Sequence, residues 1–178
     1  VALYDRAEGA AGRAAWPAAK ALPWDAWLDT LWHEALAAGV VPARTRLRTQ
    51  TQSAYAWHRI VAADAMPLID PRGAAVVAAE AWSLVHAWGA GGESWRAWAG
   101  GGDDESDDCA VFARWANRYT REQEAAHFID FALLPDRLCT WAGRMPALRG
   151  AAFNFAGFAE FAPQQERLVA ALAAAGAS

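Results

Sequence analysis

The segment from Ala152 to Gln165 follows the residue order of a nucleotide-binding site, but its acidic residues are missing. An apolar run predicts a short strand, and Pro163 then starts an amphipathic helix rich in Ala and Leu. At the end of such a strand an ATPase needs one carboxylate to hold the Mg²⁺ shell and a second to polarise the attacking water. Ala156 and Gly157 occupy these two places, and neither can bind a metal or accept a proton. Because the sequence also lacks a G-x-x-x-x-G-K-S/T phosphate loop, we expect no ATP hydrolysis.

The other polar clusters do not have the spacing of a catalytic or metal-binding motif. The acidic run Asp103–Asp108 lacks the alternating ligands and the central Gly of an EF-hand loop, and carboxylates are expected at a helix N-terminus in any case. A solvated loop is the simpler interpretation, and an enzyme acting through this run is a distant alternative. The glycine-rich stretch Gly89–Gly92 has no phosphate-binding Lys. We expect no metal and no cofactor, since the histidines also lack ligand spacing (His33, His58, His86, His127).

Composition and charge favour a folded protein without a generally basic surface. The chain has 178 residues, of which 55% are hydrophobic, so it can bury a substantial core as one domain. Its net charge of −4 argues against broad nucleic-acid binding. Arg44, Arg46 and Arg48 form a local basic cluster, and they are the candidate DNA-binding residues.

Cysteine usage and hydropathy indicate the cytoplasm. Cys109 and Cys139 lie far apart in helix-like segments, which predicts two buried thiols, and no secretory signal is recognisable. No apolar run approaches the ~18 residues of a membrane span. The chain begins at Val1 without an initiator Met and ends in Ala-rich sequence, so we interpret it as a piece of a longer protein.

Helical periodicity dominates the chain, with about six to eight helices and at most two short strands. The predicted strands are Lys20–Pro23 and Ala152–Phe155. Thr49 or Thr51 is expected to cap one helix, and Asp70 another. The clearest helices are predicted over Trp24–Ala38, Pro71–Trp88, Asp107–Glu124 and Pro163–Ala174, with a shorter helix ending at Ala142.

Most of the eleven tryptophans lie at core spacing on apolar helix faces. Trp95 and Trp98 are different, because they lie in a short turn of helix between two glycine-rich stretches. These two are the candidates for an exposed or interface role.

Three patches of sequence resemble a known family. Gly157–Gln165 resembles the degenerate second motif of AddB/RexB-type helicase–nuclease subunits. It is more similar to a bacterial family of probable DNA repair proteins with a C-terminal PD-(D/E)XK nuclease domain, which typically reads G-F-D-x-x-T-P-Q-Q here. Tyr4–Leu28 is similar to that family's early Y-D…G…A-W-P-T-P…L-P-L-D-A-W-L. Ala79–Trp82, with Phe112–Ala116, resembles its helical middle.

The resemblance implies a mainly α fold derived from a superfamily 1 helicase. Residues 1–178 would form a single domain of a longer protein, in which 1–28 and 150–178 are remnants of a helicase 1A-like α/β core and 29–149 is a helical 1B-like insertion. The two predicted strands would then be parallel neighbours. Among the motif residues, Ala156 and Gly157 replace the catalytic pair, Glu160 falls at the second acidic position, and Gln165 falls where active helicases keep a motif-ending Gln.

Two functions from different classes follow from these patterns. The first is a non-catalytic helicase-like scaffold domain of a DNA repair nuclease, which positions DNA or a partner helicase–nuclease subunit. The alternative is a plain α-helical protein-interaction module unrelated to helicases. The first function requires parallel strands at Lys20–Pro23 and Phe153–Ala156, whereas the second predicts a pure helical bundle.

Overall fold

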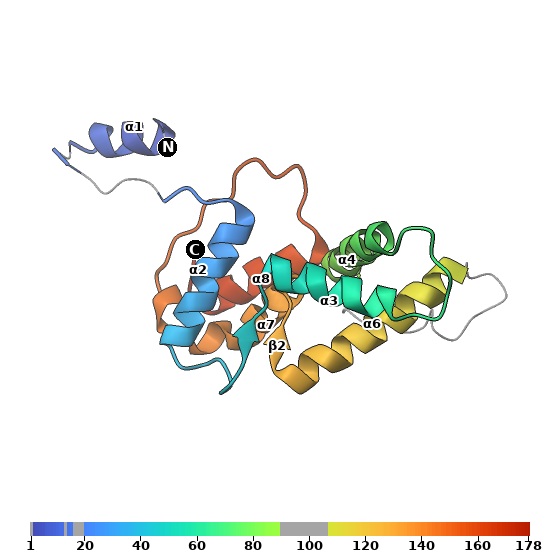
Figure 1. Ribbon diagram of the computed structural model, residues 1–178. Helices are drawn as coiled ribbons and strands as arrows, with labels where there is room; N and C mark the ends of the chain where they lie inside the picture. The colour runs from blue at the N-terminus through green and yellow to red at the C-terminus, as the bar shows by residue number, and fades with distance from the viewer. Residues whose placement is uncertain (1, 13, 16–19, 90–106) are drawn as a thin grey trace.

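A computed structural model describes residues 2–12, 14–15, 20–89 and 107–178 of the chain (Figure 1). Helices dominate the described residues, which confirms the predicted mainly α fold. A single pair of short strands accompanies them in this part of the chain. In chain order the elements are α1 (Ala2–Ala10), α2 (Trp24–Ala37), β1 (Arg46–Leu47), α3 (Gln50–Ala62), α4 (Pro71–Trp88), α6 (Asp107–Ala126), β2 (Phe128–Ile129), α7 (Leu134–Trp141) and α8 (Pro163–Ala174).

Local sequence signals set the starts of two central helices. Thr49 caps α3: its hydroxyl accepts a bond from the Gln52 amide, and the Gln52 side chain accepts one from the Thr49 amide. Asp70 caps α4 by accepting from the Arg72 amide, and Pro71 occupies the first helical position. Both caps lie at residues that the sequence predicts as caps. Each satisfies an amide that the first helical turn leaves unpaired.

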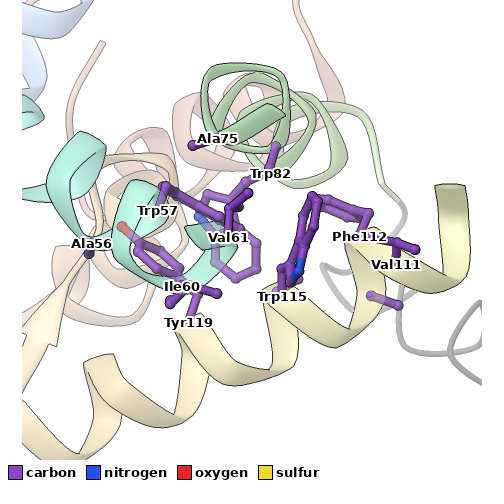
Figure 2. Close-up of a cluster of buried hydrophobic side chains, with 13 residues drawn as sticks. Ala56, Trp57, Ile60, Val61, Ala75, Trp82, Val111, Phe112, Trp115 and Tyr119 are labelled. Atoms are coloured by element: carbon purple, nitrogen blue, oxygen red, sulfur yellow. The ribbon is translucent and has the colours of Figure 1, made fainter. Parts of the chain in front are cut away.

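The buried apolar side chains form two clusters. In the α3–α4–α6 core, aromatic rings from three helices meet, as Figure 2 shows. Trp57 stacks on Tyr119 with ring centroids 4.3 Å apart, and Trp82 meets Tyr119 edge-on at 5.4 Å. The α2–α7–α8 core contains mainly Leu side chains, among them Leu28, Leu138 and Leu168. The segment from β2 to α7 connects the two cores.

The predicted strand pair at Lys20–Pro23 and Ala152–Phe155 is wrong. Neither segment is a strand, and the parallel pair is formed by β1 and β2, with Arg46 opposite Phe128 and Leu47 opposite Ile129. Lys20–Pro23 is exposed throughout and leads directly into α2, and Pro23 has no amide N–H to donate to a neighbouring strand. The β1–β2 pair forms because Leu47 and Ile129 pack one of its faces into the α2–α7–α8 core.

The segment after Leu148 pairs with the last described residues of the chain. The Gly150 amide donates to the Gly176 carbonyl at 2.9 Å, the Ser178 amide donates to Ala151 at 2.9 Å, and the Phe153 amide donates to Ser178 at 2.7 Å. This alternation is the pattern of a parallel ladder. Ala151–Phe153 is therefore extended, but it is not the predicted strand Ala152–Phe155, and it pairs with the residues that follow α8. The fold is neither a pure helical bundle nor the pairing that the resemblance implies.

Candidate functional site

The degenerate motif lies in an exposed loop between an extended segment and α8. Ala156, Gly157 and Glu160 are all exposed, and Gly157 has a φ of +84°, which favours glycine. The Gln165 side-chain oxygen accepts a bond from the Ala162 amide at 2.9 Å and so caps α8. In this fold Gln165 is therefore used to start a helix.

The neighbouring Gln164 is the buried polar residue of this motif. Its amide nitrogen donates to the Ala132 carbonyl at 2.8 Å and to Asp136 Oδ2 at 2.7 Å. Arg167 donates to the other oxygen of Asp136 at 3.2 Å. These bonds fix α8 against the start of α7. Sequence reasoning missed Gln164, although its i, i+4 spacing to the buried Leu168 was a usable signal.

An aromatic cluster joins the motif to the start of α2. Trp27 meets Phe153 at 5.4 Å and Phe155 at 5.2 Å between ring centroids, both edge-on. Trp24 meets Phe158 at 5.9 Å. The two regions that the resemblance makes neighbours therefore lie side by side, but rings rather than backbone hydrogen bonds connect them.

A second polar centre surrounds Asp130, directly after β2. Asp130 is 5% exposed, and its Oδ2 accepts bonds from Ser53 Oγ at 2.6 Å and from Tyr119 Oη at 2.5 Å. Its Oδ1 accepts from the Ala132 amide at 3.0 Å. Burial, together with the negative charge of Asp130, raises the pKa of Tyr119 far above its usual range, so this phenol keeps its proton and donates. No motif indicated this centre, because Ser53 lies on α3, Tyr119 on α6 and Asp130 directly after β2.

The basic cluster is divided by the fold. Arg44, with a φ of +70°, and Arg46 are exposed. Arg48 is only 8% exposed, and its guanidinium lies over the rings of Tyr119 at 5.1 Å and Phe128 at 5.0 Å. The assignment of Arg48 to a DNA-binding surface is therefore corrected, because its side chain packs inside the protein.

His86 is a buried histidine that contacts the Trp82 ring at 4.2 Å. Neither of its ring nitrogens has a hydrogen-bond partner among the described residues. Burial lowers the pKa of His86, and the negative charges of Asp136 and Asp130 only partly oppose this effect. We therefore assign His86 as a neutral core residue.

The stability of the protein should fall on mild acidification because of His86. In the unfolded chain this histidine takes up a proton below its ordinary pKa of 6.5, whereas the native state resists protonation. The free energy of unfolding therefore keeps its full value above that pH. Below it, the free energy of unfolding declines by up to about 1.4 kcal/mol per pH unit. Urea unfolding between about pH 8 and about pH 5 measures this decline. The substitution His86→Leu should flatten the profile, and an unchanged profile in that variant would assign the decline to other groups.

The remaining candidates have mixed outcomes. Trp95, Trp98 and the first part of the acidic run, residues 103–106, lie outside the described residues. Asp107 and Asp108 begin α6, as expected for carboxylates at a helix N-terminus. In the described ranges no group of three His, Cys, Asp or Glu side chains could hold a metal ion.

The cysteines are half-buried and form no disulfide with each other. Burial raises the pKa of the Cys139 thiol, which disfavours the nucleophilic thiolate. No helix in the part of the chain that the structure describes is long and apolar enough to cross a membrane.

Comparison with known protein families, with curated proteins and with solved structures gave no match to this chain.

Proposed function

We propose that this chain is a non-catalytic helicase-like scaffold domain of a DNA repair nuclease, which positions DNA or a partner subunit. The strand pair expected for this function at Lys20–Pro23 and Phe153–Ala156 does not form. What supports the proposal is the extended segment Ala151–Phe153, which is followed by helix α8 and is bonded in parallel to Gly176–Ser178. The order resembles a strand–helix–strand unit of an α/β core, although neither extended segment is a strand; in such a core, ligands bind beyond the carboxyl ends of the strands. Ala156 and Gly157 follow the extended segment after Asn154 and Phe155, in the part of the motif where an ATPase requires carboxylates.

The contacts between distant parts of the chain also support this proposal. Under it, residues 1–28 and 150–178 belong to one core-like part and residues 29–149 to a helical insertion. The aromatic cluster joins Trp24 and Trp27 to Phe153–Phe158, which lie in the two pieces of that core-like part. The α3–α4–α6 core, in contrast, consists entirely of residues from the insertion.

A helical protein-interaction module is the second candidate, and one surface favours it. α4 exposes large apolar side chains that no described helix covers, and such a patch often marks a protein contact. Its members are Val76, Val77, Leu84 and Trp88, between 51% and 63% exposed.

Assays for nucleotide hydrolysis and for DNA cleavage test the scaffold proposal. With Mg²⁺ and either ATP or linear DNA, the purified chain should give no turnover above a protein-free blank. Mg²⁺-dependent turnover in either assay would reject a non-catalytic role. Determining the sequence that flanks this chain in its open reading frame separates the two candidates. An Asp…(Asp/Glu)-x-Lys core downstream is expected only for the nuclease family.

A further inference from the structure

An open groove of about 460 Å³ lies along β1, beside α2 and the start of α3. Its volume falls within the range of about 300–1,000 Å³ that is usual for ligand sites. Three elements, α2, β1 and β2, supply the apolar lining residues, and the rest of the lining is polar or cationic. The lining residues are Trp32, Leu36, Thr45, Arg46, Leu47, Thr49, Gln52 and Phe128, and we call this hollow the β1 groove.

The charge of the β1 groove is opposite to that of the whole chain. Arg46 is the cation of the lining and no lining residue is acidic, although the net charge of the chain is −4. No ion pair joins Arg46 to a carboxylate among the described residues. Arg48 adds a second positive charge behind Phe128, and its buried Nη1 has no hydrogen-bond partner there. This arrangement is complementary to an anionic ligand.

Phe128 holds the Arg46 guanidinium in place. The guanidinium carbon lies 5.1 Å from the centroid of the Phe128 ring, and the ladder register sets the two residues opposite each other. Because the guanidinium is planar, it can stack on a base and also donate to a phosphate. Phe128 is thus a positioning residue for Arg46.

The polar lining residues supply hydrogen-bond donors. The Thr49 oxygen and the Gln52 side-chain oxygen accept the capping bonds of α3. The Thr49 hydroxyl proton and the Gln52 NH₂ group remain available to donate. The Arg46 guanidinium, which can stack on a base, and the neutral donors beside it suit a phosphate chain with unpaired bases.

We propose that the β1 groove binds single-stranded DNA, with Arg46 as the contact to phosphate and base. This inference rests on the proposed function and deepens it, because it names the form of DNA that is positioned. A second open hollow, on α6, fits DNA less well. It contains Glu124, and its two arginines are already engaged: Arg114 lies 3.5 Å from Asp64, and Arg121 donates to the Asn117 carbonyl at 3.4 Å.

Fluorescence anisotropy with a labelled oligothymidylate of about 16 nucleotides tests the proposal over a series of salt concentrations. Arg46→Ala should weaken binding and reduce the slope of log K against log salt by about 0.7, the value for one lost phosphate contact on a single strand. Phe128→Leu keeps the charge and removes only the ring that positions Arg46, so it should weaken binding by about two- to fivefold, the effect of one exposed cation–π contact, while the slope stays unchanged. Arg144→Ala, which removes an exposed arginine outside the groove, is the matched control.

Three outcomes would overturn the β1 groove as the DNA site. In the first, the wild-type chain does not bind the oligothymidylate at low salt. In the second, Arg46→Ala binds it with the affinity of the wild-type chain. In the third, Arg121→Ala loses as much affinity as Arg46→Ala, which would move the site to α6. Thermal melting of each variant establishes that it is folded. Failure of DNA binding leaves the scaffold proposal intact, whereas Mg²⁺-dependent hydrolysis would reject that proposal whatever the DNA result.

Discussion

Replacing Asp130 with Ala should lower the free energy of unfolding by about 3–5 kcal/mol. The substitution removes the acceptor of the Ser53 and Tyr119 hydroxyls and of the Ala132 amide. Hydrogen bonds to a charged group contribute about 1.5–3 kcal/mol each, and the buried Tyr119 hydroxyl would lose its acceptor. Urea unfolding followed by circular dichroism measures the change.

Asp29→Ala is the matched control for Asp130. Asp29 is exposed on α2 and pairs only loosely with His33, at 3.5 Å, so its loss should change the unfolding free energy by less than about 0.5 kcal/mol. Equal destabilisation by the two substitutions would contradict a stabilising role for the Asp130 hydrogen bonds.

Replacing Trp57 with Ala should cost about 3–5 kcal/mol. Trp57 is 1% exposed and lies at the centre of the α3–α4–α6 core, as Figure 2 shows. It stacks on Tyr119 at 4.3 Å and meets Trp82 at 5.9 Å, so truncation leaves a cavity between three helices. Chemical denaturation measures this loss, and near-ultraviolet circular dichroism should show weaker aromatic signals.

Tyr55→Ala, on the same helix, is the control for Trp57. Tyr55 is 68% exposed, so its truncation should change stability by no more than about 0.5 kcal/mol. Since Tyr119 contacts both Trp57 and Asp130, the two large effects should not add. A double-mutant cycle should give a coupling of at least about 0.5 kcal/mol, and strict additivity would contradict the shared role of Tyr119.

Helices were predictable because their signals are local. Pro71–Trp88 and Pro163–Ala174 have the bounds that periodicity and the N-terminal prolines predict. The strands were not predictable, because β1 has only two residues and α3, α4 and α6 separate it in the sequence from its partner β2. Pairing over such a distance depends on which faces are buried, and no short window of sequence contains that information.

In the candidate site, too, only the features that depend on residue type could be predicted from the sequence. Ala156 and Gly157 could be identified as non-catalytic from residue type alone, because neither side chain has a donor or an acceptor. The different burial of Arg46 and Arg48 could not be predicted, because Arg46 lies in β1 and Arg48 directly follows it, and only the fold places Tyr119 against Arg48. The helicase-like function stays a prediction.

The sequence alone determined the helical class, the caps of α3 and α4, and the missing carboxylates, because each depends on residue type and near neighbours. Only the tertiary structure decided that Ala151–Phe153 pairs with the residues that follow α8 in the sequence. It also decided that Asp130 joins Ser53 to Tyr119. These contacts connect residues far apart in the chain, and they form only where packing brings both partners out of water together.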